Sequence, residues 1–133
     1  MQDSIFTKII KGEVPCHKIY EDTKTIAFLT INPITPGHTL VVPKEQVDHL
    51  WNLYDDDYHA VMDTTKKVAN RIQEVLQPVR VGEHVAGMEV PHAHIHLFPF
   101  NNLEEFWKRP QETSPPDEEL ADMAAQLRMQ DEL

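Results

Sequence analysis

Three histidines alternate with apolar residues in the segment 91–99, which reads Pro-His-Ala-His-Ile-His-Leu-Phe-Pro. This alternation predicts a strand on which His92, His94 and His96 share one face while the residues between them point into a core. Imidazole nitrogens need hydrogen-bond partners, so three histidines on one face are hard to explain by packing alone. We therefore interpret the segment as a functional site.

Two kinds of chemistry fit such a cluster. Neutral imidazoles that converge on one point can hold zinc, copper or iron. Alternatively, one histidine attacks phosphorus or a carbonyl carbon while its neighbours orient it and offset charge. The spacing of the histidines leaves both possibilities open.

Composition limits the partners of this cluster. The 133 residues are expected to form a single domain, 1–133, and the formal net charge of −10 argues against a nucleic-acid partner or an anionic membrane surface. No apolar run approaches the length of a membrane span, and no signal-peptide pattern is present at the N-terminus. The single cysteine, Cys16, excludes an internal disulfide and is expected to be a small buried side chain. We expect a cytoplasmic protein.

The remaining patterns predict the elements that position the histidines. Residues 1–100 are expected to form the core, with a short helix ending at Gly12, a hairpin over 18–22 and 25–31, and a strand over 39–42. A long helix over 55–76 and a strand over 79–86 follow in the core. After the core we expect a loop over 101–116 and a C-terminal helical extension over 117–133. This order is typical of an α+β fold with a largely antiparallel sheet of about five strands. Phe106 and Trp107, in the predicted loop, could cover the site or dock the C-terminal helix.

Segment 90–98 resembles the histidine-triad signature of the HIT superfamily, His-x-His-x-His followed by apolar residues. The likeness continues in segments 5–15, 27–33 and 36–44, which resemble the Hint-like branch of that superfamily in the same order along the chain. Together these motifs span residues 4–100, and the C-terminal helix resembles an extension found in some bacterial members. The resemblance implies a HIT-like fold.

This resemblance also implies an activity. Members of the family are nucleotidyl hydrolases or transferases that act on the α-phosphate of nucleoside phosphoramidates or dinucleoside polyphosphates. By the family pattern, His94 is the nucleophile, which forms a nucleotidyl-histidine intermediate, and its second nitrogen donates to the carbonyl of His92. His96 and His38 would orient the rings and offset charge on the phosphoryl oxygens. The family needs no cofactor for this chemistry, takes a small nucleotide as its partner and implies a homodimer.

The chain departs from the family at a zinc site. Many Hint-like relatives bind a structural zinc through two cysteines, a histidine and the first triad histidine, and those positions here read Ser4, Thr7, Gln46 and His92. Hydroxyl and amide side chains are poor substitutes for thiolate and imidazole at zinc, so we expect no bound metal. His49 leaves a shifted site open, but we interpret it as a surface histidine.

Further departures concern the substrate. Thr30 stands where the family often has an aspartate that holds the ribose hydroxyls, and a neutral hydroxyl there should weaken ribose recognition by about 1–2 kcal/mol. Met88, next to Glu89, stands where a glutamine commonly lies near the phosphate and leaving group. Four apolar residues are expected to line a base pocket, or alternatively to complete the core: Ile5, Phe6, Ile9 and Phe28.

Two alternatives to the hydrolase therefore remain open. Thr30 and Met88 are compatible with a nucleotide-binding or regulatory module that is catalytically weak. A metalloprotein in which His92, His94 and His96 are ligands is the third hypothesis.

Overall fold

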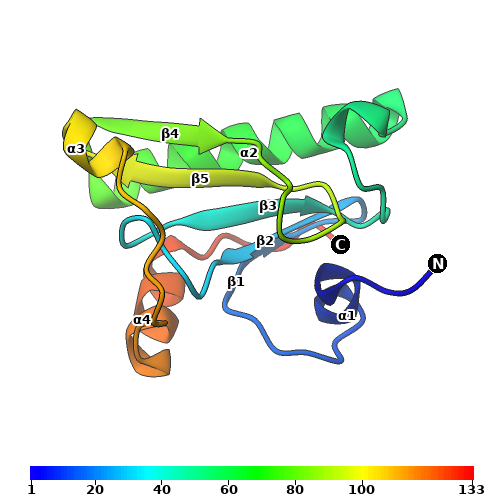
Figure 1. Cartoon of the computed structure of the whole chain (residues 1–133), viewed down its shortest axis with the longest axis horizontal. Coiled ribbons are helices and arrows are strands. Elements are labelled where there is room, and N and C mark those ends of the chain that lie inside the picture. Colours follow the sequence, from blue (N-terminus) through cyan, green and yellow to red (C-terminus); the bar gives the residue numbers. More distant parts are fainter.

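The computed structural model describes residues 1–133 and contains one antiparallel sheet in the order β1-β2-β3-β5-β4 (Figure 1). The strands are β1 Lys18–Glu21, β2 Thr25–Leu29, β3 Thr39–Pro43, β4 Arg80–His84 and β5 Ile95–Phe100. The helices are α1 Ile5–Ile10, the 3-10 helix η1 Leu50–Asn52, α2 Asp55–Leu76, α3 Leu103–Phe106 and α4 Asp117–Leu127. This architecture confirms the predicted α+β class and the predicted number of strands.

The long helix α2 covers one face of the sheet. It begins at three consecutive aspartates, which the helix dipole favours, and it ends where Gln77 adopts a left-handed conformation before Pro78. Val61, Val68 and Ile72 of its apolar stripe are completely buried against the sheet. Neither α2 nor any shorter helix combines the length and the apolar character that crossing a membrane requires.

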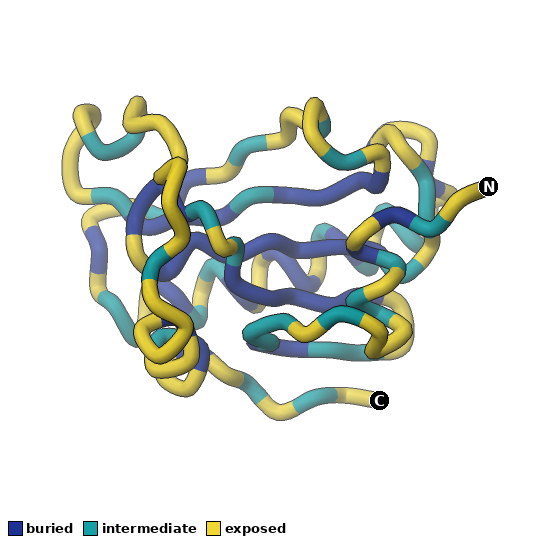
Figure 2. The backbone as a smooth tube through the Cα atoms, turned by 60° about the horizontal axis from the view of Figure 1, so that its bottom comes forward, coloured by how far each residue is buried: buried dark blue, intermediate teal, exposed yellow.

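The short helix α1 packs on the opposite face of the sheet. Side chains alternate along a strand, so Ile26 and Phe28 of β2 face α1, while their neighbours in the chain face α2. Phe6 is the buried residue of α1, and its ring contacts the ring of Phe28 edge-on at 5.7 Å. Figure 2 shows the buried strands lying between more exposed segments. The face that carries α1 is also the face that carries the histidines.

The predicted histidine strand is shorter than expected, because β5 begins only at Ile95. The last pair that β5 forms with β3 joins Ile95 to Val41, and before it the backbone turns away, so that the Ala93 N–H donates to the carbonyl of Val47 at 2.7 Å. The alternation nevertheless holds, since Ala93, Ile95 and Leu97 are all buried in the main core. The expected direction of the apolar side chains is confirmed.

Residues 101–116 are not wholly a loop, because they contain α3, which Asn102 caps by accepting from the Glu105 N–H at 2.9 Å. Phe106 of α3 packs against Phe98 and Phe100 of β5. It therefore docks on the end of the sheet rather than on the C-terminal helix, and Trp107 is 74% exposed.

The C-terminal extension is helical only to Leu127, so the prediction of a helix over 117–133 was too long. After Leu127 the chain is extended and runs beside β1 (Figure 1). Met129 and Glu132 donate their N–H groups to the carbonyls of Ile19 and Glu21, both at 2.9 Å. The tail bonds to backbone groups at the edge of the sheet, and a straight helix would leave those groups without a protein partner.

Gly82 of β4 is expected to be intolerant of a side chain. A Cβ at this position would lie 3.0–3.2 Å from the rings of Phe98, Phe100 and Phe106. Gly82→Ala should therefore destabilise the protein by about 1–3 kcal/mol, the usual cost of overpacking. The exposed neighbour Glu83→Ala, which meets no such contact, should change stability by less than about 0.5 kcal/mol. Equal midpoints for the two variants in denaturant unfolding would show that the aromatic cluster is not close-packed.

Candidate active site

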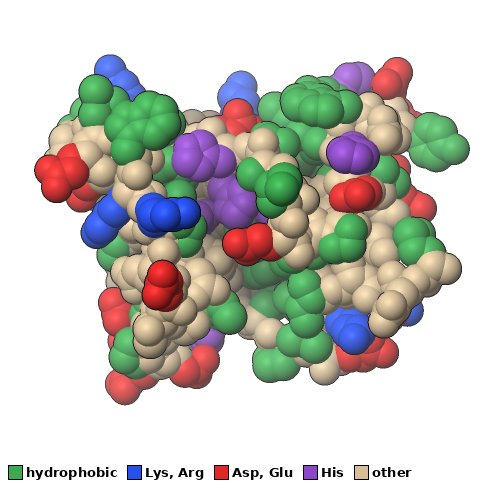
Figure 3. All heavy atoms as spheres, in the orientation of Figure 1, with side chains coloured by type: hydrophobic (Ala, Val, Ile, Leu, Met, Phe, Trp, Pro, Cys, Tyr) green, Lys and Arg blue, Asp and Glu red, His purple; other side chains and the backbone are tan.

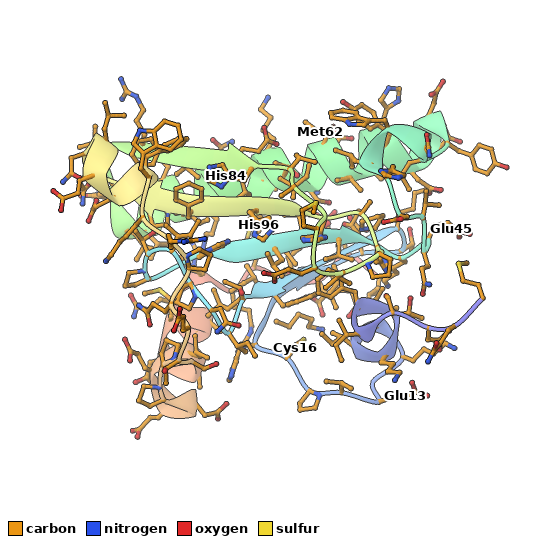
Figure 4. All side chains as sticks on the ribbon, viewed as in Figure 1. Glu13, Cys16, Glu45, Met62, His84 and His96 are labelled. Atoms are coloured by element: carbon orange, nitrogen blue, oxygen red, sulfur yellow. The ribbon has the colours of Figure 1, made fainter.

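A cavity of about 700 Å³ lies on the α1 face of the sheet. Its floor crosses neighbouring strands at one level, from His96 of β5 to Leu40 of β3 and Phe28 of β2, because these residues are register partners. Figure 3 shows histidine side chains near the middle of the molecular surface beside hydrophobic ones, and Figure 4 shows His96 over β5 and Cys16 beyond β2. A cavity of this size is in the range of small-molecule sites.

His94 is held with one nitrogen inward and one outward. Its Nδ1 lies 2.8 Å from the carbonyl oxygen of His92, and a carbonyl only accepts, so Nδ1 carries the proton. In the neutral ring Nε2 therefore keeps its lone pair, and it has no protein partner. Because no buried side-chain nitrogen or oxygen lacks a partner, this Nε2 must be accessible from the cavity. The site thus presents an unprotonated nucleophilic nitrogen.

His94 is only 6% exposed, so the face of the strand that carries it is covered rather than open. It packs edge-on against Phe6 at 5.0 Å and against His96 at 4.9 Å. Because the chain leaves the sheet before Ile95, the side chain of His94 lies beneath α1, against Phe6. Packing therefore restricts the orientation of the nucleophile.

His38 and His96 form a relay with defined protons. The Ile34 N–H donates to Nδ1 of His38 at 2.9 Å, so Nε2 of His38 carries a proton and donates to Nδ1 of His96, also at 2.9 Å. His96 then carries its own proton on Nε2, which has no protein partner. Like the lone pair of His94, this N–H must be accessible from the cavity.

Both rings of the relay are neutral near pH 7. Burial, with a smaller contribution from neighbouring histidines, lowers the pKa of His38 to about 3 and that of His96 to about 4. A neutral His96 can offset charge on a phosphoryl oxygen as a hydrogen-bond donor through its Nε2–H rather than as a cation. His38 is buried and does not line the cavity, so it acts through His96.

His92 is an internal residue. Its Nε2 lies 2.8 Å from the carbonyl of Pro43 and must donate to it, and its Nδ1 accepts from the hydroxyl of Ser4 at 2.7 Å. Burial lowers the pKa of His92, which keeps the ring neutral. Both nitrogens are occupied, so this residue positions His94 through its carbonyl and does not face the cavity. The three triad rings therefore do not converge on one point, as shared metal ligands would.

The other predicted substrate residues divide into two groups. Ile5, Phe6, Ile9 and Phe28 all line the cavity, as do Thr30 and Glu89. Met88 does not line it and is 90% exposed, so position 88 offers nothing to a substrate in this arrangement.

Three polar residues near the site were not identified from the sequence. His84 of β4 is paired with His96 of β5, and its ring contacts Phe98 and Phe106. His17 and Asp117 line the cavity together, although 100 residues separate them in the chain. The sequence placed Asp117 only at the start of the predicted C-terminal helix, and no sequence pattern connects it to His17.

The geometry agrees with comparisons to known proteins. The HIT domain family model matches residues 11–103 of the chain. The chain belongs to the HIT family. A HIT-like protein of Borreliella burgdorferi is 37% identical over 97% of this chain and 99% of its own length. The adenosine 5′-monophosphoramidase hnt1 of Schizosaccharomyces pombe is 37% identical over 75% of this chain and 76% of its own length. The crystal structure of a HIT-like protein from Bartonella henselae superimposes with a TM-score of 0.84 and 28% identity over 95% of this chain and 94% of that one.

In this HIT protein, hydrogen bonds join the four residues at the expected zinc positions. The Thr7 hydroxyl donates to Oε1 of Gln46 at 2.6 Å, and the Ser4 N–H donates to the same oxygen at 2.9 Å. Ser4 also caps α1 by accepting from the Thr7 N–H, and its hydroxyl contacts Nδ1 of His92. These residues do not fit zinc, since the set holds no thiolate and its one imidazole is already bonded at both nitrogens. His49 is exposed, as interpreted.

This HIT protein is expected to need no metal. Its purified form should carry no stoichiometric transition metal, because hydrogen bonds among Ser4, Thr7, Gln46 and His92 already satisfy the polar atoms at the zinc positions. Elemental analysis tests the content, and thermal unfolding with and without a chelator tests the stability. A full equivalent of tightly held zinc would contradict this prediction.

Ser4 should be important for stability. Ser4→Ala removes the N-cap of α1 and the donor to a buried imidazole nitrogen, so the free energy of unfolding should fall by about 1–3 kcal/mol. Ser114→Ala, an exposed serine in the loop before α4, is the matched control and should stay within about 0.5 kcal/mol of the native protein. Urea unfolding midpoints decide the outcome, and equal midpoints would exclude the proposed role of the Ser4 hydroxyl.

Proposed function

We propose that this protein is a nucleotidyl hydrolase or transferase that acts at the α-phosphate of nucleoside phosphoramidates or dinucleoside polyphosphates. The observation that carries the proposal is the proton placement on His94, whose Nδ1 is committed to the His92 carbonyl and whose Nε2 is free toward the cavity. Family members named adenosine 5′-monophosphoramidase support the substrate class.

The first step forms a bond between Nε2 of His94 and the α-phosphorus. The bond from phosphorus to the leaving amine or phosphate breaks, and the leaving group takes up a proton from solvent, which the attacking water replaces in the second step. The His94 ring becomes positively charged as the new bond forms. The carbonyl of His92, 2.8 Å from Nδ1, stabilises that charge because it accepts a hydrogen bond from the cationic ring. Water then attacks phosphorus, and the P–N bond breaks to restore neutral His94.

His96 would stabilise the phosphoryl group during both steps. Its Nε2–H is the histidine donor beside His94, and the His38 relay holds it in that tautomer. A donor fixed before the reaction stabilises developing negative charge without the cost of reorganising. His38 is then a positioning residue.

The apolar part of the cavity would take the base. Ile5, Phe6 and Ile9 of α1 line this part together with Phe28 and Leu40 of the sheet, and they form an apolar surface next to His94. An aromatic base placed there would be buried largely by apolar contacts, which carry little base specificity.

A nucleotide-binding module with weak catalysis is the second candidate. The exposure of Met88 favours it, because this position supplies no polar group to the phosphate or to the leaving group. Nucleotide binding without turnover would support this alternative.

We also propose that two copies associate through β4, as the family resemblance implies. β4 is an edge strand with no partner on its outer side, and Val79 and Val85 at its two ends are exposed. Unpaired strand edges readily accept a strand from another chain.

Replacing His94 should abolish turnover. His94→Asn keeps a donor for the His92 carbonyl but removes the nucleophile, so turnover of an adenosine phosphoramidate should fall by several orders of magnitude while nucleotide still binds. His96→Ala should lose about 10²–10³-fold, the usual cost of one oxyanion donor. Rapid acid- and base-quench experiments with mass spectrometry should find phosphorus on a histidine of the native protein, labile in acid and stable in base.

The exposed His49→Ala is the control and should retain native activity. Unfolding curves must accompany each variant, because His94 is buried and its removal leaves a gap beneath Phe6. Retained activity in His94→Asn, or no adduct on a substrate that is turned over, would exclude the mechanism.

A further inference from the structure

A hydrogen-bonded pair of a histidine and an aspartate lies at the end of the cavity away from the catalytic histidines. Nε2 of His17 lies 2.9 Å from Oδ1 of Asp117, and both residues line the cavity. His17 precedes β1, and Asp117 is the first residue of α4. The C-terminal extension therefore contributes a side chain to the same cavity as His94 and His96.

The sheet register places this pair relative to the nucleophile. His96 of β5 pairs with Leu40, Leu40 pairs with Phe28, and Phe28 pairs with Lys18 of β1, the residue after His17. The Leu29 N–H donates to the carbonyl of His17 at 3.0 Å, so the pair lies beside the end of β2, where Thr30 also lines the cavity. Figure 4 shows the same order, with His96 over β5 and Cys16, the neighbour of His17, beyond β2. The sugar of a nucleotide with its phosphorus at His94 would lie on this floor between the two ends, on the side of Thr30 and Asp117.

The pair is not needed to hold α4 in place. The Asp117 side chain is 90% exposed, and exposed ion pairs contribute about 0–1 kcal/mol to stability. The helix is instead anchored by three buried residues, Leu120, Ala124 and Leu127, and by the backbone bonds that follow it. A structural role therefore does not account for the position of the pair in the cavity.

Asp117 has acceptor capacity to spare. Its Oδ1 accepts from His17, and Oδ2 has no protein partner. Two other polar side chains nearby already have protein partners. The Thr30 hydroxyl accepts from the Asn32 N–H, and the Asn32 side-chain amide donates to the carbonyl of Gln111. Only one other carboxylate, Glu89, lines the cavity, and it comes from the loop next to the histidines. Asp117 is the carboxylate available at the far end.

We propose that Asp117, oriented by His17, accepts hydrogen bonds from the sugar hydroxyls of the nucleotide and determines a preference for ribose. This inference rests on the proposed function, since it concerns the same cavity. It revises the expectation drawn from Thr30, because the carboxylate that is absent at position 30 is replaced by one from α4. A carboxylate suits this role, since it accepts from two adjacent hydroxyls more strongly than a neutral group does.

The test compares the binding of adenosine 5′-monophosphate and of its 2′,3′-dideoxy analogue by calorimetry. The native protein should bind the ribonucleotide at least about tenfold more tightly, as hydrogen bonds to a charged acceptor allow. Asp117→Ala should lose most of that ratio by weakening ribonucleotide binding alone. Glu118→Ala, the neighbouring carboxylate that does not line the cavity, should keep the native ratio. His17→Ala should reduce the ratio without changing the affinity for the dideoxy analogue, a result that mere loosening of the fold would not give.

The outcomes separate this inference from the proposed function. An Asp117→Ala variant with the native ratio, or a native protein that binds both nucleotides equally or not at all, would overturn the inference. A native protein that shows the ratio but turns over no phosphoramidate or dinucleoside polyphosphate would remove the hydrolase proposal, and the assignment of Asp117 would stand.

Discussion

The hydrogen bond from Nδ1 of His94 to the carbonyl of His92 determines the chemistry that the site can perform. An imidazole buried without charge carries one proton, and its partners decide which nitrogen holds it. Here backbone groups make that decision: the carbonyl of His92, the N–H of Ile34 and the carbonyl of Pro43. As a result, His94 offers a lone pair and His96 offers an N–H to the same cavity.

Much of the fold follows from patterns within short segments. The alternation around His94 predicted which side chains enter the core, and the apolar stripe from Val61 to Ile72 predicted α2. Boundaries were less predictable where backbone bonds override local propensity. β5 starts late because Ala93 bonds to Val47, and α4 stops early because the tail bonds to β1.

The site was predictable only in part, because its geometry depends on contacts between distant segments. Residue types and spacing identified His94 and His96 as residues of a site, and family resemblance identified His38 and the apolar lining. Neither could reveal that His38 and His96 are neutral, since that follows from burial in the folded chain. The partnership of His17 with Asp117 joins segments that have no shared motif. Met88 was misplaced because its loop directs the side chain to solvent.

The extended C-terminal segment also affects how copies of the chain can assemble. An open sheet has two edges, and a protein with both exposed can add strands without limit, which leads to fibres. In this sheet the tail residues Met129 and Glu132 occupy part of the β1 edge. If copies pair through β4 as proposed, assembly would stop at two, because the tail covers the opposite edge.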